Sequence, residues 1–172
     1  MGIELVREGQ GATVKGVKVP TLFRKGRERR VGHATQTWAA LTRKQRGEMA
    51  EAAFLAMAAR LGLRVSKPWG ESSRYDLIVD NGKRLLRVQV KSAHRADKYG
   101  GYTFHAHGNT SRVYSATEID LLVAYVVPAE AWYLFPVEEF RKYKSMKLFP
   151  ASRRRLSKFE EFREAWRLVS QS

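Results

Sequence analysis

The sequence lacks several features that define common classes of protein. It has no cysteine, which excludes disulfide bonds and thiolate zinc sites. No stretch approaches the roughly 20 consecutive apolar residues of a membrane-spanning helix, and the first residues show no apolar signal-peptide core. Acidic residues are also scarce, because 17 Asp and Glu stand against 32 Lys and Arg. We therefore expect a soluble protein that works inside the cell.

The excess of basic residues is uneven along the chain. Residues 1–46 carry 11 basic and 3 acidic side chains, residues 47–127 carry 11 and 8, and residues 128–172 carry 10 and 6. The flanks therefore hold most of the net charge of +15. A basic surface neutralises phosphate groups, which favours a nucleic-acid partner. Basic charge is also common in ribosomal and membrane-surface proteins, so charge alone does not select DNA.

The length of 172 residues and the hydrophobic share of 44% predict one folded domain with a substantial core. Residues 1–37 are interpreted as a basic N-terminal extension, and residues 38–172 as the folded domain with its C-terminal helix. The extension contains three candidate DNA-binding side chains, Arg27, Arg29 and Arg30. Such a cluster could become ordered in the minor groove of DNA, or it could be a solvated tail.

Hydrophobic periodicity predicts an α/β domain. Residues 42–62 are typical of a helix, because Thr42 and Gln45 form a capping-box pattern ahead of apolar residues at the 3.6 period. Six apolar runs bounded by turn signals predict strands, at residues 63–66, 75–80, 85–91, 102–106, 121–127 and 132–135. A short helix is predicted from residue 136 or 137 to 143, and an amphipathic helix over residues 158–169.

Two of these strands bring polar side chains together. The turn Asn81–Gly82 joins them into a hairpin that places Asp76 beside Gln89 and Lys91. Because side chains alternate along a strand, Gln89 and Lys91 share one face while Val90 points into the core. Alternatively, Gln89 and Lys91 form the solvated face of an antiparallel strand, and Asp76 ends a turn.

The residue types suit phosphodiester hydrolysis. An Asp carboxylate is a hard oxygen ligand for Mg²⁺, and the Gln89 amide and the Val90 carbonyl can add neutral oxygens. The Lys91 ammonium remains available for substrate. The reaction needs an activated water, neutralised charge and in-line geometry, and a metal with a lysine can supply all three.

The order and spacing of several motifs resemble the PD-(D/E)XK nuclease superfamily. The motifs are G-E-M-A-E at 47–51, P-W-G-E-S-S-R-Y-D at 68–76, R-V-Q-V-K at 87–91, E-I-D-L-L-V-A-Y at 118–125 and Y-L-F-P-V at 133–137. Asp76 and Lys91 match the Asp and Lys of the motif. Gln89 stands at the acidic position, as in the branch that includes group I intron homing endonucleases. The resemblance implies a restriction-endonuclease-like fold, a mixed β-sheet flanked by helices.

Superfamily members also place a Glu on the helix before the first strand. Glu51 lies roughly 90° from the middle of the apolar stripe of the helix, whereas Glu48 lies roughly 150° from it. We therefore expect Glu51 to reach the sheet edge as a metal or metal-water ligand, and Glu48 to face solvent. Glu71 is a reserve metal ligand.

The resemblance implies a Mg²⁺-dependent DNA endonuclease that leaves a 5′-phosphate. The implied catalytic residues are Glu51, Asp76, Gln89 and Lys91, with Asp76, Glu51, Gln89 and the Val90 carbonyl as metal ligands. Mn²⁺ is expected to substitute for Mg²⁺, and the neutral Gln89 leaves the number of metals open. Cleavage of both strands needs two centres, which implies a homodimer or a higher homo-oligomer. A cytoplasmic, nucleoid-associated location follows.

Other polar residues flank this centre. The candidate contacts to the DNA backbone are Lys67, Arg74, Arg95, Asn109 and Arg112. Residues 98–112 are rich in Gly, His, Asn and Ser and predict a mobile loop. His105 and His107 within it could form a metal pair or a general base, although polar packing is commoner. We expect Asp120 to make a structural hydrogen bond.

Two alternative functions remain open. One is a structure-selective nuclease of the Holliday-junction resolvase type, or a repair nuclease. The other is a non-catalytic nucleic-acid-binding protein that keeps the nuclease fold. Buried acids that repel phosphate argue against a pure binder.

Overall fold

The computed structural model describes residues 13–14, 17–18, 38–70, 72–108, 111–152 and 157–170. The chain divides into two units, residues 1–35 and residues 36–172. In the first unit, β1 (Thr13–Val14) pairs antiparallel with β2 (Val17–Lys18). The candidate DNA-binding residues Arg27, Arg29 and Arg30 lie outside the described residues.

The second unit begins with the 3₁₀ turn η1 (Trp38–Ala40) and the helix α1 (Arg43–Arg60). The backbone N–H of Gln45 donates to Thr42 Oγ1 at 3.2 Å, and the backbone N–H of Thr42 donates to Gln45 Oε1 at 2.9 Å. This reciprocal pair is the predicted capping box. Gly62 follows the helix with φ of 70°, a left-handed conformation that glycine adopts without strain. Among the described residues, no helix is long and apolar enough to span a membrane.

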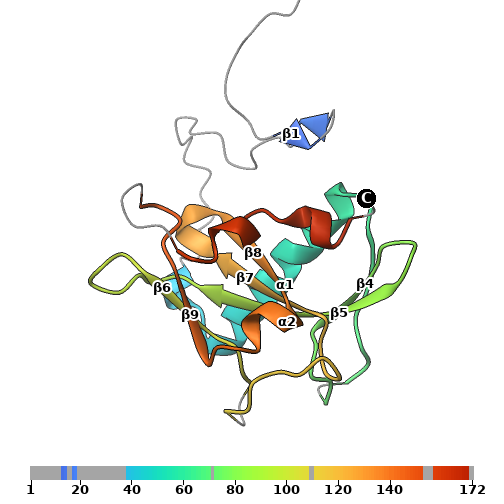
Figure 1. The fold of residues 1–172 in the computed structure, drawn as a ribbon, viewed down its shortest axis with the longest axis horizontal. Helices are drawn as coiled ribbons and strands as arrows, with labels where there is room; N and C mark the ends of the chain where they lie inside the picture. Colours follow the sequence, from blue (N-terminus) through green and yellow to red (C-terminus); the bar gives the residue numbers. More distant parts are fainter. Residues whose placement is uncertain are drawn as a thin grey trace, which may run out of the picture. The chain divides into compact units, whose positions relative to one another are not determined.

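A five-stranded mixed sheet forms the centre of the second unit (Figure 1). Its strands, in spatial order, are β3 (Arg64–Ser66), β4 (Leu77–Asp80), β5 (Leu85–Ala93), β7 (Leu121–Val126) and β8 (Ala131–Pro136). Only β5 and β7 are parallel neighbours; the other pairs are antiparallel. The predicted strands and the β4–β5 hairpin are confirmed. A mixed sheet with a flanking helix is the predicted fold class.

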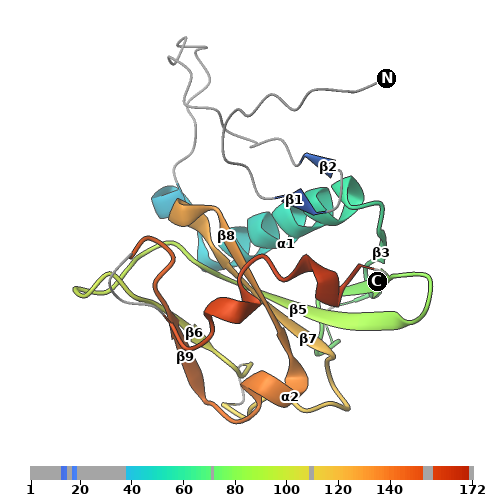
Figure 2. The ribbon, with the colours of Figure 1, turned by 45° about the horizontal axis from the view of Figure 1, so that its top comes forward.

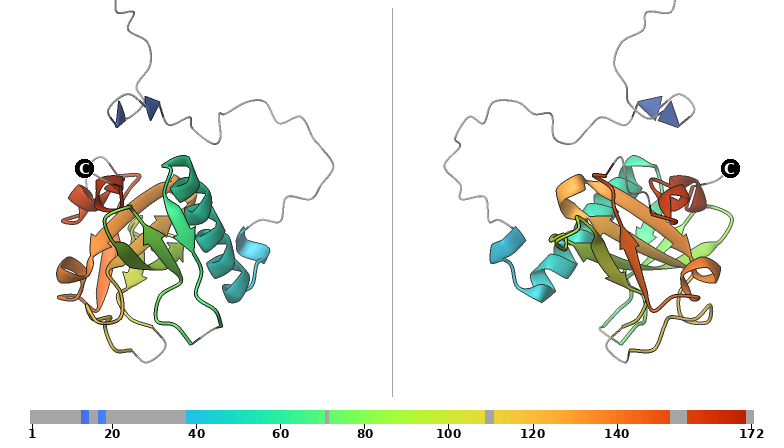
Figure 3. Two further views of the ribbon diagram at one scale, coloured as in Figure 1. Left: turned by 90° about the vertical axis from the view of Figure 1, so that its right-hand side faces the viewer. Right: turned by 60° about the vertical axis from the view of Figure 1, so that its left-hand side comes forward.

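Different elements cover the two faces of the sheet (Figures 2 and 3). The helix α1 packs on one face. On the other face lie a second pair of strands, β6 (Tyr102–His105) and β9 (Ser145–Leu148), and the short helix α2 (Val137–Phe140). Strand alternation decides which side chain enters which core: Leu121 and Val123 of β7 belong to the α1 side, and Leu122 and Ala124 belong to the other.

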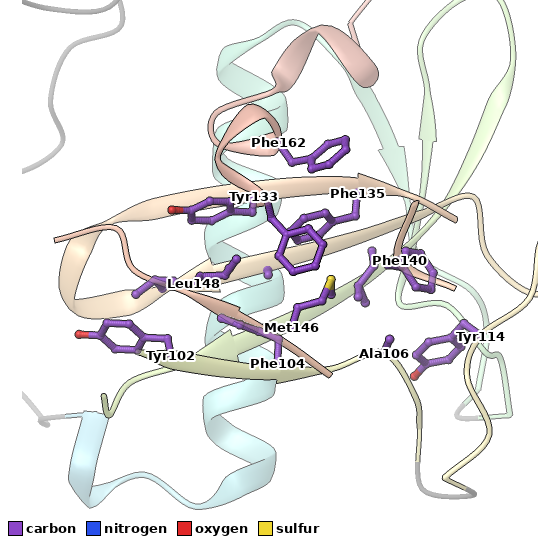
Figure 4. Close-up of a cluster of buried hydrophobic side chains, with 14 of the residues drawn as sticks. Tyr102, Phe104, Ala106, Tyr114, Tyr133, Phe135, Phe140, Met146, Leu148 and Phe162 are labelled. Carbon is purple, nitrogen blue, oxygen red and sulfur yellow. The ribbon is translucent and has the colours of Figure 1, made fainter. Parts of the chain in front are cut away.

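The core on the β6–β9 side is largely aromatic (Figure 4). Tyr133, Phe135, Phe140 and Met146 are at most 1% exposed. Burying each such side chain contributes roughly 1.5–3 kcal/mol to the stability of the fold, so this core stabilises the adjoining end of the sheet. Tyr114 lies at the margin of the same cluster and is 4% exposed.

The predicted helix over residues 158–169 is wrong. Two 3₁₀ turns, η3 (Glu160–Phe162) and η4 (Trp166–Leu168), replace it. Glu164 breaks the segment with φ of 48°, because its backbone N–H donates to Trp132 O at 2.8 Å and its carboxylate accepts from the Trp132 N–H at 2.8 Å. Docking against the edge of β8 therefore overrides the helical periodicity. The aromatic side chains of this segment are nevertheless buried, as predicted.

Smaller features of the fold also differ from the predictions. β6 confirms the strand predicted at residues 102–106, so the loop predicted over residues 98–112 is interrupted there. Strand β9 itself was not predicted, since its partner lies some 40 residues earlier in the chain and four residues give little periodic signal. Helix α2 ends at Phe140 rather than at residue 143. A 3₁₀ turn, η2 (Val127–Ala129), follows β7 directly.

Candidate active site

The β4–β5 hairpin brings Asp76 to β5. Leu77, the first residue of β4, pairs with Val88 of β5. Asp76 immediately precedes Leu77 and therefore lies alongside the residues that follow Val88. Asp76 Oδ2 accepts the backbone N–H of Val90 at 2.7 Å and the side-chain N–H of Gln89 at 2.5 Å. The juxtaposition predicted from the sequence is therefore present, and two N–H donors fix the carboxylate.

Lys91 follows on the same strand and is partly buried. Its Nζ lies 5.6 Å from the centre of the Tyr114 ring, within the range of a cation–π contact. Burial lowers the pKa of Lys91 below its ordinary value of 10.5; the charge of Asp76 acts in the opposite direction and that of Arg74 in the same direction. The charges of Lys91 and Asp76 therefore act on each other.

Glu51 reaches this site from α1. Its side chain is 18% exposed, and its Oε2 lies 2.8 Å from Lys67 Nζ. Glu51, Asp76 and Lys67 line one pocket of about 340 Å³. Glu48 is exposed, as predicted, but also lines this pocket. The remaining lining residues are Arg43, Lys44, Gly47, Pro68, Gly70, Ser73 and Tyr75.

The electrostatics of Asp76 reflect its surroundings. Burial raises the pKa of Asp76 above its ordinary value of 3.8, and the negative charge of Glu51 raises it further. The hydrogen bonds from Val90 and Gln89 and the charge of Lys91 act in the opposite direction. A cation bound beside Asp76 would favour its ionised form.

The oxygen atoms here suit a hard divalent cation. They comprise the Asp76 and Glu51 carboxylates, the Gln89 amide oxygen and the Val90 carbonyl, which are ligand types of Mg²⁺. Within the described part of the chain, no three His, Cys, Asp or Glu side chains form a metal-binding group. With Gln89 at the acidic position, Asp76 and Glu51 are the two carboxylates of the expected ligand set. A divalent cation held here would need several water ligands.

An arginine and a tyrosine extend the site beyond the predicted residues. Arg74 Nε donates to Glu118 Oε1 at 3.1 Å, and Arg112 Nη2 donates to the same oxygen at 2.5 Å. The guanidinium carbon of Arg74 also lies 5.0 Å from the centre of the Tyr114 ring. Among the described residues, no group hydrogen-bonds to the buried Nη2 of Arg74. Two of the predicted DNA contacts, Arg74 and Arg112, are thus hydrogen-bonded to the same glutamate.

The other predicted DNA contacts are separately placed. Lys67 lies at the pocket and is bonded to Glu51, while Arg95 is exposed just beyond β5. Asn109 and the reserve ligand Glu71 lie outside the described residues.

The two histidines lie close together. The ring centres of His105 and His107 are 5.1 Å apart, and His107 Nδ1 lies 2.8 Å from the carbonyl oxygen of Gly108. Among the described residues, neither histidine belongs to a metal-binding group of three side chains. This placement matches polar packing.

Asp120 makes the expected structural hydrogen bonds. Its Oδ2 accepts the backbone N–H of Arg87 at 2.7 Å and the Nε–H at 3.0 Å, and its Oδ1 accepts from Nη2 at 3.0 Å. Arg87 Nη1 also donates to the carbonyl of Thr117. These Arg87–Asp120 hydrogen bonds join β5 to the start of β7. Arg87 lies two residues before Gln89, so the bonds help to set the position of the candidate site.

Sequence reasoning missed Tyr114 and Glu118. Glu118 begins the motif E-I-D-L-L-V-A-Y, so its position was visible although its role was not. Tyr114 gave no signal, because its place beside Gln89 depends on how residues 106–120 return across the sheet. Its hydroxyl donates to Gln89 Oε1 at 3.3 Å.

These features define a nuclease fold. Residues 41–169 match the family described as PD-(D/E)XK endonuclease, so the chain belongs to that family. The matched range includes all four candidate site residues, and PD-(D/E)XK nucleases generally use divalent metal ions.

Solved structures show the likeness in three dimensions. The bacterial homing endonuclease I-Ssp6803I is 34% identical, with a TM-score of 0.70 over 76% of this chain and 95% of that chain. The Holliday junction resolvase Hjc of the archaeal hyperthermophile Archaeoglobus fulgidus is 20% identical, with a TM-score of 0.42 over 60% of this chain and 84% of that chain. No curated protein matches the chain.

Proposed function

We propose that this protein is a Mg²⁺-dependent endonuclease that hydrolyses phosphodiester bonds in DNA. One observation carries the proposal: Gln89 donates a hydrogen bond to Asp76 at 2.5 Å, Glu51 lines the same pocket as Asp76, and the charge of Lys91 acts on Asp76. The family membership and the likeness to a homing endonuclease support the same reaction.

Each side chain has a proposed role in the reaction. Asp76 and Glu51 hold the metal, and Gln89 and the Val90 carbonyl contribute oxygen ligands or orient a water. The bound metal would acidify the attacking water and neutralise charge on the phosphate. Lys91 provides a second positive charge next to the phosphate, which suits the negative charge that develops there. Mn²⁺ offers similar oxygen coordination and should support activity.

The surroundings of the pocket suit a nucleic-acid backbone. Arg43, Lys44 and Lys67 line it, so three basic residues lie in the same pocket as the carboxylates. We assign phosphate contacts to the candidate residues Lys67, Arg74, Arg95, Asn109 and Arg112, and to the extension over residues 1–37 with Arg27, Arg29 and Arg30.

Trp69 adds a surface for base stacking. Its side chain is 100% exposed, and its neighbours Pro68 and Gly70 line the pocket. A fully exposed tryptophan is costly in water and offers a flat face to an unstacked base. Its position between two residues that line the pocket would bring such a base near the cleaved bond.

Double-strand cleavage would require two such sites. A homodimer or a higher symmetric homo-oligomer would supply them, each copy acting on one strand. A DNA-cutting enzyme of this kind would work in the cytoplasm with the nucleoid.

The test compares DNA substrates and active-site variants. Supercoiled plasmid, branched DNA, single-stranded DNA and RNA are incubated with Mg²⁺ or with EDTA. We expect the wild type to cleave DNA in Mg²⁺ only, and Asp76→Ala and Lys91→Ala to bind DNA without cleaving it. Binding without cleavage by the wild type would indicate a non-catalytic binder. Cleavage confined to branched DNA would indicate a resolvase-type enzyme.

A further inference from the structure

The side-chain amide of Gln89 is held at both ends. Its Nε2 donates to Asp76 Oδ2 at 2.5 Å and to the Val90 carbonyl at 3.3 Å, and its Oε1 accepts the hydroxyl of Tyr114 at 3.3 Å. Gln89 is 9% exposed and Tyr114 is 4% exposed, so water has little access to this pair. The partners on either side therefore determine which way the amide points.

In this orientation Gln89 is not a metal ligand. An amide nitrogen carries two N–H donors and no free lone pair for a cation, so only Oε1 can coordinate. Oε1 points to Tyr114, away from the carboxylate that is proposed to hold the metal. For Gln89 to coordinate at Asp76, the amide must turn by about 180°, so that its oxygen faces the carboxylate. Two oxygens facing each other repel, and a cation between them removes that repulsion.

Turning the amide also reverses the hydrogen-bond partner that Gln89 requires on the Tyr114 side. The NH₂ group would then face Tyr114 and require an acceptor, where the oxygen had required a donor. A hydroxyl is both a donor and an acceptor, and it can rotate to serve either need. A phenylalanine could serve neither state.

Tyr114 is well fixed for this task. Arg74 and Lys91 both lie within cation–π distance of its ring, at 5.0 and 5.6 Å. Its backbone N–H donates to the carbonyl of Ala106 at 3.0 Å. The hydroxyl hydrogen can therefore rotate while the oxygen keeps its place.

We propose that Tyr114 is a positioning residue whose hydroxyl donates to Gln89 Oε1 without metal and accepts from Gln89 Nε2 when Gln89 Oε1 binds a divalent cation. The proposal rests on the metal site of the proposed function. The proposal gives a physical role to glutamine at this position. Without a metal, the Gln89 amide donates a hydrogen bond to Asp76, whereas a third carboxylate would repel Asp76.

Nuclear magnetic resonance provides the direct test. The side-chain amide protons of Gln89 are followed in full-length protein in EDTA and in Mg²⁺. We expect nuclear Overhauser effects from these protons to the Tyr114 ring to appear in Mg²⁺ and to be weak in EDTA. Mg²⁺ binding that leaves the amide protons beside Asp76 would overturn the proposal while the proposed function stands. Absence of Mg²⁺ binding together with absence of cleavage would overturn both.

A double-mutant comparison tests the role of the hydroxyl. Tyr114→Phe should weaken Mg²⁺ binding roughly fivefold by calorimetry, because the metal-bound state then contains a buried N–H without an acceptor, which proteins tolerate less than an under-satisfied carbonyl. In a Gln89→Glu background the same change should not weaken binding, since a carboxylate presents oxygen on both sides. An equal loss in both backgrounds would indicate a merely structural role and overturn the proposal.

Tyr133→Phe is the matched control. Tyr133 is also buried, and its hydroxyl donates to Glu160 at 3.1 Å, outside the site. The control removes one buried tyrosine hydroxyl and should leave Mg²⁺ affinity unchanged.

Discussion

Lys67 Nζ lies 2.8 Å from Glu51 Oε2, so an ammonium group already neutralises the helix carboxylate that lines the candidate metal site. This hydrogen bond raises the pKa of Lys67 above its ordinary value of 10.5, so the lysine stays charged across the physiological range. A metal that binds Glu51 must compete with this ion pair. Metal binding at Glu51 would release Lys67 to contact a phosphate.

The first prediction concerns this competition. Lys67→Ala should raise Mg²⁺ affinity by up to about fivefold, because an exposed ion pair contributes only about 0–1 kcal/mol and Lys67 is 62% exposed. Calorimetry without DNA measures the change. Arg64→Ala is the control, since Arg64 is also exposed and ion-paired, with Asp80 at 3.0 Å. Equal Mg²⁺ affinity in wild type and Lys67→Ala would contradict the competition.

The second prediction concerns the stability of the metal-free protein. Burial raises the pKa of Asp76, with Glu51 adding to the effect, so the folded chain holds this proton to higher pH than the unfolded chain. Ionisation therefore costs folding free energy; the cost is absent below the ordinary value of 3.8, begins as pH rises through it, and is complete above the folded pKa. Asp76→Asn should raise Tm in EDTA at pH 7 by roughly 2–4 °C.

Asp120→Asn provides the opposite case. Burial acts to raise the pKa of Asp120, but its bonds to Arg87 and the Arg87 charge hold it below its ordinary value. The ionised form therefore stabilises the fold above that value, and Asp120→Asn should lower Tm in the same buffer. Scanning calorimetry at pH 4 and pH 7 measures both variants. A lower Tm for Asp76→Asn at pH 7 would show that ionised Asp76 stabilises the fold.

The third prediction concerns the glutamine at the acidic position. Gln89→Glu places a third carboxylate beside Asp76 and replaces the N–H that now donates to it. We expect a lower Tm than wild type in EDTA, because like charges repel in a buried site, and roughly tenfold tighter Mg²⁺ binding. Thermal denaturation in EDTA and with increasing Mg²⁺ tests this. Tm values that fall equally in both conditions would contradict the metal-ligand role.

The fourth prediction concerns the exposed tryptophan. Trp69→Ala should weaken DNA binding roughly tenfold, since base–aromatic stacking contributes about 1–3 kcal/mol per base. Its Tm should not change, because the side chain is fully exposed. Fluorescence anisotropy of labelled DNA in EDTA measures affinity without cleavage. Leu85→Ala is the control, an exposed apolar residue that does not line the pocket; a similar loss in both variants would contradict a stacking role.

The sequence by itself determined the local structure and the main chemistry. Thr42 and Gln45 set the start of α1, and the turn after Asp80 set the β4–β5 hairpin, because caps and tight turns depend on residues a few positions apart. Strand alternation then required Gln89 to point to the same face as Lys91. These local rules were sufficient to bring Asp76 next to Gln89.

Only the tertiary structure decided the relationships between distant segments. The 3.6-residue period over residues 158–169 predicted a helix, but hydrogen bonds between Glu164 and Trp132 hold that segment as two 3₁₀ turns. Tyr114 lies 25 residues from Gln89, and no period or motif connects them. Contacts of this kind form only when the chain returns across the sheet, because burial and hydrogen bonding to distant partners outweigh local preference.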